Sequence, residues 1–349
     1  MAVTIRDVAR EAGVSISTVS RALASPELVA EPTRSHVQSI AHKMGYRPNR
    51  AARGLITGRS GSIGLVVPDL ENPFFGSVCK GVQARARAAG YTVFFADTDE
   101  DAALESEIVH SLLKQVDGVI LCSPRTTDAE IQQLATETPL VLANRHLEGI
   151  PSIKFDNASG VAAILRHLMA LGHRKIAYAG GPPNAWANRE RTVAFEQIGA
   201  ANPELELIEL GNFPPFFSGG VEVGDLAIAS GATAVVAYND IMALGVIDRL
   251  RQRGLTAPRD LSVTGFDNVP VSTFVWPNLT TIDLPRIRLG RTSLDLLVDL
   301  IEGSSVPGPA IELPVELIVR QSTGIPTSNS SDTQLPAPSG APELLDADV

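Results

Sequence analysis

The stretch "TIRDVAREAGVSISTVSRAL", residues 4–23, decides the fold of the first part of the chain. Its apolar residues recur at the spacing of one helix face: Ile5, Val8, Ala9 and Ala12. Thr4 can cap this helix and Gly13 can end it, while Ser15 can cap a second helix over "ISTVSRALA". Two helices joined by a few residues that include glycine form the helix-turn-helix pattern. The sequence therefore predicts a small all-α head.

The head is followed by a basic segment. A third helix is predicted from Glu31 and Pro32 onward, and Gly45 closes a head of residues 1–46. The next stretch, "RPNRAARGLITGRSG" (47–61), holds four arginines and no acid, and a helix of this length is marginal alone in water. Residues 1–60 carry nine Lys and Arg against four Asp and Glu, whereas the remainder carries 20 against 35. A basic head on an acidic body predicts a polyanionic partner for the head only.

From Gly61 onward the chain has the pattern of an α/β protein. Continuous apolar strands such as "SIGLVVPDL" (62–70), "ATAVVAYND" (232–240) and "DLSVTGFDN" (260–268) alternate with amphipathic helical runs. Such strands predict parallel sheets covered on both faces, and their number favours two doubly wound halves over one sheet. Ligands of these folds bind beyond the carboxyl ends of the strands. The polar residues at those ends are Asp69, Asn72, Asn144, Asn239, Asp240 and Asp267.

Several classes of protein are excluded by what the sequence lacks. No apolar run approaches the roughly 20 residues of a membrane span, and the N-terminus has no apolar signal region. Cys79 and Cys122 are expected to be reduced core thiols, and no metal-ligand spacing is present. The absence of a P-loop lysine and of GxSxG and HExxH motifs argues against a cofactor and against an enzyme. Residues 326–349, with four acids and no Lys or Arg, are expected to be a disordered tail.

Head and body together resemble one known family. "TIRDVAREAGVSISTVSRAL" followed by "GYRPNRAARGL" is similar to the head and hinge of the lactose-repressor (LacI/GalR) family of bacterial transcription factors. "SIGLVVPDLENPFF", "GHRKIAYAGGP", "AVVAYNDIMALGV", "DLSVTGFDN" and "LIVRQSTG" continue the resemblance in family order, so that it covers residues 2–325.

The resemblance implies an architecture of three parts before the tail. A helix-turn-helix head and a hinge helix over 47–61 would precede a periplasmic-binding-protein-like α/β body over 62–325. The body would consist of two doubly wound parallel-sheet subdomains with the effector bound between them. Their expected extents are about 62–157 plus 284–314 for the first and about 158–283 plus 315–325 for the second.

The resemblance also implies which residues contact DNA. Ile16, Ser17 and Arg21 match the family's base-reading positions, and an arginine can hold guanine through two hydrogen bonds in the major groove. Leu55 matches the family's leucine wedge, which enters the minor groove and bends the duplex, with packing on the body as the alternative. Further residues match phosphate-contacting or capping positions: Ser15, Thr18, Asn49, Arg50 and Arg53. For Thr18, packing toward the core of the head is the alternative.

The resemblance places effector contacts on aromatic and polar residues of the body: Phe74, Phe75, Asn144, Arg191, Phe213, Asn239 and Asp267. Trp186 has no firm family equivalent, and it either stacks on a sugar ring or anchors its loop. The alternative for Arg191 is a surface salt bridge, and the alternative for Asp267 is a helix cap. Carboxylate, amide and guanidinium groups beside aromatic faces suit a neutral polyol, so a pentose, hexose or nucleoside is the leading effector class.

These expectations combine into a transcriptional regulator, most simply a repressor, that binds a pseudo-palindromic operator as a homodimer. It would act in the bacterial cytoplasm, at the nucleoid when bound to DNA. The effector would change the angle between the subdomains and thereby the spacing of the paired hinges. The alternative is the same regulator controlled by a phosphorylated metabolite or by a protein corepressor.

Overall fold

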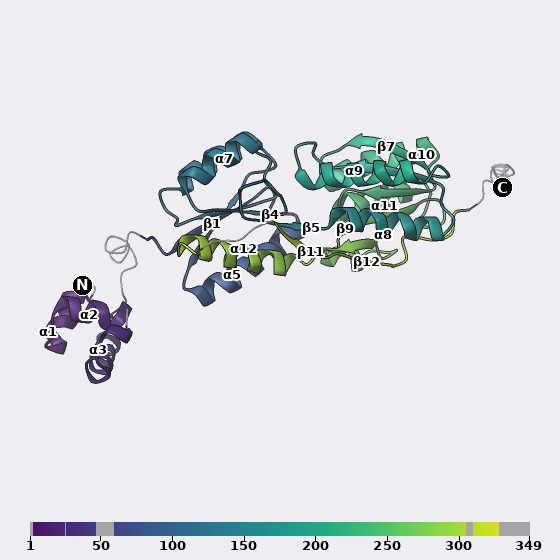
Figure 1. Ribbon diagram of the computed structural model, residues 1–349. Helices are drawn as coiled ribbons and strands as arrows, with labels where there is room; N and C mark the ends of the chain where they lie inside the picture. The colour runs from purple at the N-terminus through teal and green to yellow at the C-terminus, as the bar shows by residue number, and fades with distance from the viewer. Residues whose placement is uncertain (1–2, 25, 47–58, 305–309, 328–349) are drawn as a thin grey trace, which may run out of the picture. The chain divides into compact units, whose positions relative to one another are not determined.

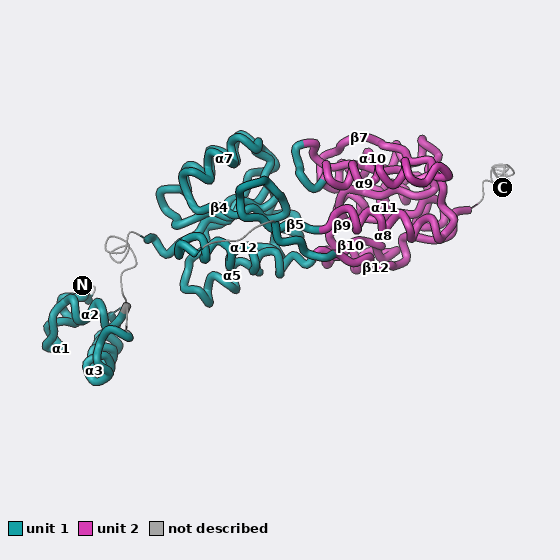
Figure 2. The backbone as a smooth tube through the Cα atoms, viewed as in Figure 1, with its two compact units in different colours: residues 1–155, 184–187, 285–314 teal, residues 156–183, 188–284, 315–349 magenta. Residues whose placement is uncertain are grey.

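The computed structural model describes residues 3–24, 26–46, 59–304 and 310–327, and Figure 1 shows their elements. The chain divides into two compact units, which Figure 2 colours separately. Unit 1 holds residues 1–155, 184–187 and 285–314, and unit 2 holds residues 156–183, 188–284 and 315–349. The family resemblance assigns residues 184–187 to the second subdomain together with their neighbours, whereas the structure groups them with unit 1. Residues 47–58 of the hinge and 328–349 of the tail lie outside the described residues.

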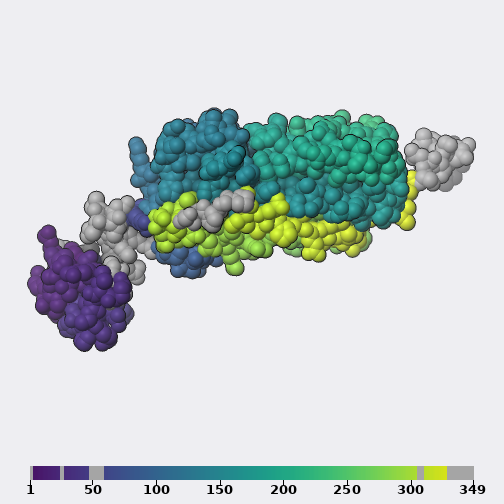
Figure 3. Space-filling model, in the orientation of Figure 1, coloured from purple at the N-terminus to yellow at the C-terminus, as the bar shows by residue number. Residues whose placement is uncertain are grey.

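The head is built from helical elements around one small core. They are α1 (Ile5–Ala12), α2 (Ile16–Ala24), the 3₁₀ helix η1 (Pro26–Leu28) and α3 (Glu31–Lys43). Thr4 caps α1 in a capping box with Asp7, and Gly13 ends the helix in the left-handed conformation, as the sequence predicts. The core consists of Val8, Ala9, Ala12, Val19, Ala22, Val37 and Ala41. Figure 3 shows the residues of the head, in purple, packed against one another.

The body of unit 1 is a six-stranded parallel sheet in the order β11-β5-β4-β3-β1-β2. Its strands are β1 (Ser62–Val67), β2 (Thr92–Asp97), β3 (Val119–Cys122), β4 (Leu140–Ala143), β5 (Ser152–Phe155) and β11 (Ile311–Leu313). Its helices are α5 (Pro73–Ala89), α6 (Ala102–Leu112), α7 (Asp128–Glu137) and α12 (Arg286–Ile301). The central strands β3 and β4 are buried along their whole length, which explains their continuous apolar sequence.

Unit 2 repeats this architecture in a six-stranded sheet of order β12-β10-β9-β8-β6-β7. Its strands are β6 (Lys175–Gly180), β7 (Glu206–Asn212), β8 (Ala234–Ala237), β9 (Ser262–Asp267), β10 (Thr280–Asp283) and β12 (Glu316–Ile318). Its helices are α8 (Asn157–Ala170), α9 (Trp186–Ala201), α10 (Phe217–Ser230), α11 (Asp240–Gln252) and the 3₁₀ helix η2 (Pro270–Thr273). The sheet is parallel except at β12, which runs antiparallel to β10. The doubly wound fold is therefore confirmed, with one antiparallel strand added.

Neither cysteine is bonded, and both thiols belong to the interior of unit 1. Cys122 is buried and Cys79 is partly buried. Burial raises the pKa of Cys79 to about 11 and raises the pKa of Cys122 as well, so both thiols stay protonated at neutral pH. Within the described ranges, none of the helices has the length and apolar character that a bilayer span requires.

Candidate DNA-binding and effector-binding residues

The exposed side of α2 carries the three residues that the sequence places at DNA bases. Ile16 is 46% exposed, and Ser17 and Arg21 are exposed too, whereas Val19 and Ala22 on the opposite side are buried in the head core. The Nε of Arg21 donates to the carbonyl oxygen of Ser17 at 3.2 Å, one turn earlier. This hydrogen bond holds the arginine along the exposed surface of the helix.

Hydroxyl groups organise the N-terminus of α2. The Oγ of Ser15 accepts from the Thr18 backbone N–H at 3.1 Å, so Ser15 acts as the expected cap. It also lies 2.7 Å from the Oγ of Ser17 and 2.8 Å from the Oγ1 of Thr18. Thr18 thus directs its hydroxyl to this cluster and not into the core. The remaining DNA candidates, Asn49, Arg50, Arg53 and Leu55, lie outside the described residues.

Arg191 is the centre of a buried polar cluster in unit 2. It is only 2% exposed, its Nε donates to the Oδ1 of Asn157 at 2.9 Å, and its Nη1 donates to the carbonyl oxygen of Tyr238 at 2.6 Å. The guanidinium carbon lies 3.9 Å from the ring centroid of Phe266 and 5.2 Å from that of Tyr238. Burial excludes the alternative of a surface salt bridge. A desolvated cation on aromatic faces is instead typical of a binding site.

Asn239 follows Tyr238 directly, at the carboxyl end of β8. Its Oδ1 accepts from the backbone N–H of Met242 at 2.8 Å, and its Nδ2 donates to the carbonyl oxygen of Pro215 at 2.9 Å. Asn239 is therefore the N-cap of α11, and each end of its amide already has a protein partner. A ligand can use only the second N–H and the second lone pair.

Asp267 follows Phe266 directly, at the carboxyl end of the neighbouring strand β9. It is 6% exposed, and its φ of 112° is a conformation that residues other than glycine rarely adopt. The next described helix, η2, has Val269 before its first residue and no side-chain cap, so Asp267 is not the helix cap that was its alternative. Backbone strain of this kind concentrates at functional sites, and here it falls on the residue that directly follows Phe266, whose ring contacts the Arg191 guanidinium.

Asn144 occupies the corresponding place in unit 1, after β4. It is 7% exposed with a φ of 57°, its Nδ2 donates to the Oγ of Ser123 at 2.8 Å, and its backbone N–H donates to the Ile153 carbonyl oxygen at 2.7 Å. Within the described part of the chain its Oδ1 is a buried acceptor without a hydrogen-bond partner. Such an acceptor is costly unless a ligand or water satisfies it.

Phe74 and Phe75 lie in the first turn of α5 and are 3% and 5% exposed. Their rings meet edge to face with centroids 4.9 Å apart, and the ring of Phe74 also packs on Phe155 at 6.3 Å. Asn72 caps the helix by accepting from the Phe74 backbone N–H at 2.9 Å. Both rings thus pack in the interior of unit 1, and their contact with an effector stays a prediction.

Trp186 and Phe213 are both partly buried, and the structure gives them different settings. Trp186 is the first residue of α9 and belongs to the 184–187 segment of unit 1. The backbone N–H of Phe213 donates to the carbonyl oxygen of Gly180 at 3.0 Å, just beyond the end of β7. No hydrogen bond or ring contact among the described residues joins either side chain to Arg191.

Three residues of the Arg191 cluster were not predicted from the sequence: Asn157, Tyr238 and Phe266. Asn157 starts α8 two residues after β5, and β5 itself was not predicted, so the polar group beyond its end went unnoticed. Tyr238 contributes a backbone carbonyl and Phe266 a ring face, and neither leaves a polar signal in the sequence. Their adjacency to Asn239 and Asp267 is the signal that could have found them.

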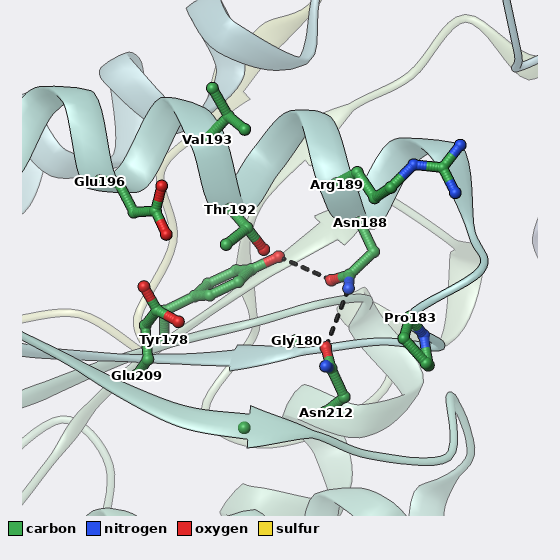
Figure 4. A pocket seen from close by; sticks show the side chains of 11 residues that line it. Tyr178, Gly180, Pro183, Asn188, Arg189, Thr192, Val193, Glu196, Glu209 and Asn212 are labelled. Atoms are coloured by element: carbon green, nitrogen blue, oxygen red, sulfur yellow. Dashed lines mark hydrogen bonds between the residues drawn. The ribbon is translucent and has the colours of Figure 1, made fainter.

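A separate cavity of about 330 Å³ lies in unit 2 between α9 and the β6–β7 edge (Figure 4). The Oδ1 of Asn188 accepts from the hydroxyl of Tyr178 at 3.1 Å and from the Gly181 N–H at 2.9 Å, and its Nδ2 donates to the Oδ1 of Asn212 at 2.9 Å. Burial raises the pKa of Glu209, which lines the cavity, and the nearby Glu196 raises it further. Through the hydrogen bond that it accepts from the Gly181 N–H, the amide of Asn188 ties α9 to the turn "AGGPP" (179–183) after β6.

Close packing leaves no room for a side chain at Gly181, in the turn after β6. A Cβ on Gly181 would lie 2.4 Å from the ring of Tyr238. We therefore expect Gly181→Ala to lower the free energy of unfolding by about 1–3 kcal/mol, as overpacking does. Urea unfolding of the variant and the wild type measures the difference.

Gly76→Ala is the matched control for this prediction. A Cβ on Gly76 has no atom within 4 Å, and the residue lies inside α5, where alanine is the better helix former. This variant should keep or raise the stability by up to roughly 1 kcal/mol. Equal effects of the two substitutions would contradict the packing argument.

Comparisons with known proteins identify the families to which the head and the body are similar. Residues 4–49 match the model of bacterial regulatory proteins of the lacI family, and residues 165–323 match a periplasmic binding protein-like domain. The chain is 33% identical to the HTH-type transcriptional repressor CytR of Escherichia coli (strain K12) over 331 residues, which cover 92% of this chain and 96% of that protein.

Solved structures similar to this chain include members of the same family. A lac repressor dimer bound to operator and the anti-inducer ONPF superposes with a TM-score of 0.82 at 30% identity, covering 93% of this chain and all of that one. A LacI family transcriptional regulator from Enterococcus faecium with bound ribose superposes with a TM-score of 0.68 at 30% identity, covering 76% of this chain and all of that one.

Proposed function

This chain belongs to the LacI family of bacterial regulatory proteins, and from that premise we propose a dimeric repressor whose operator affinity is controlled by a sugar or nucleoside. As a member of the family the protein is a DNA-binding regulator of transcription and not an enzyme. The proposal adds the dimer, the effector class and the residues that bind each partner. It places the protein in the bacterial cytoplasm, where an operator would be bound.

The proposed DNA surface is the exposed side of α2 together with the hinge. Ile16, Ser17 and Arg21 would read base edges, while Leu55 would enter the minor groove between the paired half-sites. The phosphate contacts would come from Ser15, Thr18, Asn49, Arg50 and Arg53. The exposure of α2 opposite a complete head core supports this assignment.

Exposed apolar surface in both units supports the dimer. Phe94 and Phe95 are 40% and 39% exposed on β2, the edge strand of the first sheet. Phe274 and Trp276, which follow η2 in unit 2, are each 80% exposed. Large apolar side chains on an edge strand are typical of an interface with another chain. The related lac repressor is a dimer on its operator, and we assign the same arrangement to this protein.

The observation that carries the effector class is the burial of Arg191 on Phe266 and Tyr238, with the buried Asp267 directly after Phe266 in the chain. Guanidinium and carboxylate groups would donate to and accept from hydroxyl groups, while aromatic faces would contact the C–H surface of a sugar ring. The unsatisfied Oδ1 of Asn144 is a further acceptor for a hydroxyl. The regulator from Enterococcus faecium holds ribose, a ligand of this chemistry.

A thermal-shift screen of the purified protein against pentoses, hexoses, nucleosides and phosphorylated sugars tests the effector class. A ligand bound only by the folded protein at 100 times its dissociation constant stabilises it by about 2.7 kcal/mol and raises the unfolding midpoint. We expect at least one neutral polyol to do so. Arg191→Lys should abolish that shift because lysine lacks the planar set of donors, whereas Arg174→Lys, at an exposed site, should keep it.

Three results would contradict this assignment. A shift with phosphorylated metabolites alone would replace the neutral polyol by a phosphorylated effector. Silence across the whole panel would favour a protein corepressor. A shift that persists in Arg191→Lys would place the effector elsewhere.

A further inference from the structure

Residues 59–61 are the described end of the hinge segment, and two separate parts of unit 1 hold them. We propose that Asp117 and the end of α12 form a joint that fixes the direction in which the hinge leaves the body. Asp117 and Arg59 are then positioning residues for operator recognition. The inference rests on the proposed DNA-binding function, and its test is designed to fail separately from that function.

The carboxylate of Asp117 forms the first half of the joint. Its Oδ1 accepts from the backbone N–H of Ser60 at 2.6 Å and from the Ser60 hydroxyl at 3.0 Å, and its Oδ2 accepts from the backbone N–H of Gly61 at 2.8 Å. The backbone N–H of Asp117 donates to the carbonyl oxygen of Ser62 at 2.7 Å. One acidic residue thus clamps three consecutive residues at the start of β1.

Arg59 forms the second half. Its Nη2 donates at 2.6 Å to the carbonyl oxygen of Ile301, the last residue of α12. Carbonyl groups at a helix C-terminus lack partners within the helix and carry partial negative charge, so a guanidinium suits them. Burial raises the pKa of the neighbouring Tyr91, Asp117 raises it further, and Arg59 opposes the rise. Tyr91 therefore experiences the charges of both halves of the joint.

α12 links this joint to the place where the chain enters unit 1. The chain passes from unit 2 into unit 1 between Leu284 and Pro285, and α12 begins at the next residue, Arg286. The helix then runs for 16 residues to the carbonyl that holds Arg59. A Cβ on Gly290 would lie 2.3 Å from the carbonyl oxygen of Val78 in α5, so α12 packs backbone to backbone on its neighbour. Such a helix transmits a displacement as a rigid element.

The joint matters for specific binding and not for general attraction to DNA. Specific binding needs both heads and both hinges in register with two half-sites, whereas non-specific binding depends on phosphate charge alone. Asp117 is an acid, so its removal cannot weaken phosphate binding through charge. A selective loss of operator affinity on removing Asp117 would therefore show that this residue acts by positioning the hinge.

The test compares Asp117→Asn with Glu107→Gln in the full-length protein. Both substitutions remove one acid from unit 1, but Glu107 is exposed on α6 and lies outside the joint. Binding to an operator selected from a random-sequence library and to random DNA is measured by fluorescence anisotropy over a range of salt concentrations. We expect Asp117→Asn to weaken operator binding about tenfold, to leave random-DNA binding equal or tighter, and to keep the salt slope. Glu107→Gln should change neither affinity.

Hydrogen exchange of the free protein examines the joint without DNA. The amides of Ser60 and Gly61 should be protected in the wild type and exchange faster in Asp117→Asn, with little change in the unfolding midpoint. Ser60→Ala removes the 3.0 Å hydroxyl contact with Asp117 and the 3.1 Å hydrogen bond that the hydroxyl accepts from the Ser62 backbone N–H, but it keeps both backbone hydrogen bonds to the carboxylate. It is the milder variant if Asp117→Asn does not fold, and it should show a smaller loss of operator affinity.

The outcomes separate the two proposals. Equal operator affinities of Asp117→Asn and Glu107→Gln, equal losses on operator and random DNA, or unchanged exchange at Ser60 and Gly61 would overturn the joint. A wild-type protein that prefers no sequence over random DNA would overturn the proposed function, while the exchange result would still decide the joint.

Discussion

Replacing Asp267 by alanine is expected to abolish the effector response, with the effector affinity reduced by about a hundredfold or more and basal operator binding unchanged. Asp267 is 6% exposed, has a φ of 112° and directly follows Phe266, whose ring packs on Arg191. Each hydrogen bond from a ligand hydroxyl to a buried carboxylate contributes about 1.5–3 kcal/mol, and two such bonds account for the expected loss. Titration of the operator complex with the effector found in the thermal screen measures it.

Two control variants make this result specific. Asp267→Asn has the same size and keeps one acceptor oxygen, so the loss of effector affinity should be smaller. Asp248→Ala removes a carboxylate from the exposed pair that Asp248 makes with Arg251 on α11, and it should leave the response intact. An effector response in Asp267→Ala equal to that of the wild type would remove Asp267 from the binding site.

The parts of the fold that could be predicted from the sequence are those with strong local signals. The head is one example, because Thr4, Gly13 and Ser15 act through contacts within one turn of the chain, and the structure has each in its expected role. The buried strands β3, β4 and β8 are another, because a strand covered on both faces is apolar at every position.

The elements that escaped sequence analysis lack such signals for physical reasons. β7 is an edge strand with exposed residues and two glutamates, so it shows neither a continuous apolar run nor a clean alternation. α10 contains Gly219, Gly220 and Gly224, which weaken any helix prediction. The structure gives the reason for two of them, because a Cβ would lie 1.9 Å from the Met242 carbonyl oxygen at Gly220 and 2.7 Å from the Arg249 side chain at Gly224. Tertiary packing against α11 required glycine where local propensity disfavours it.

The candidate effector site likewise contains residues that could be predicted from the sequence and residues that could not. Asn239 and Asp267 were found because polar residues at the ends of predicted parallel strands lie on one edge of a sheet, and the structure places them after adjacent strands. The resemblance supplied Arg191, and the structure adds that its cation lies on Phe266. Asn157 could not be predicted because it depends on β5, a four-residue strand. Side-chain contacts between distant segments, such as Asn157 with Arg191, are set by packing alone.

Replacing Leu55 by alanine is expected to weaken operator binding by about 10- to 100-fold and to leave binding to random DNA nearly unchanged. Burying a leucine side chain stabilises a complex by about 1.5–3 kcal/mol, and a wedge between base steps exists only on the bent operator. Random DNA is bound through phosphate charge, to which Leu55 contributes nothing. Anisotropy titrations on operator and random duplexes at one salt concentration measure both affinities.

The wedge and the joint around Asp117 predict different effects on DNA bending, so a comparison of Leu55→Ala with Asp117→Asn distinguishes their roles. Both should lose operator selectivity, but only Leu55→Ala should reduce the bend that the protein imposes on operator DNA, which energy transfer between the duplex ends reports. Asp117→Asn keeps the wedge, so the complexes that still form should be fully bent. Leu104→Ala, which truncates an exposed leucine on α6, is the matched control and should change neither affinity nor bend. Equal losses of Leu55→Ala on operator and random DNA would exclude the wedge and leave packing on the body as the role of Leu55.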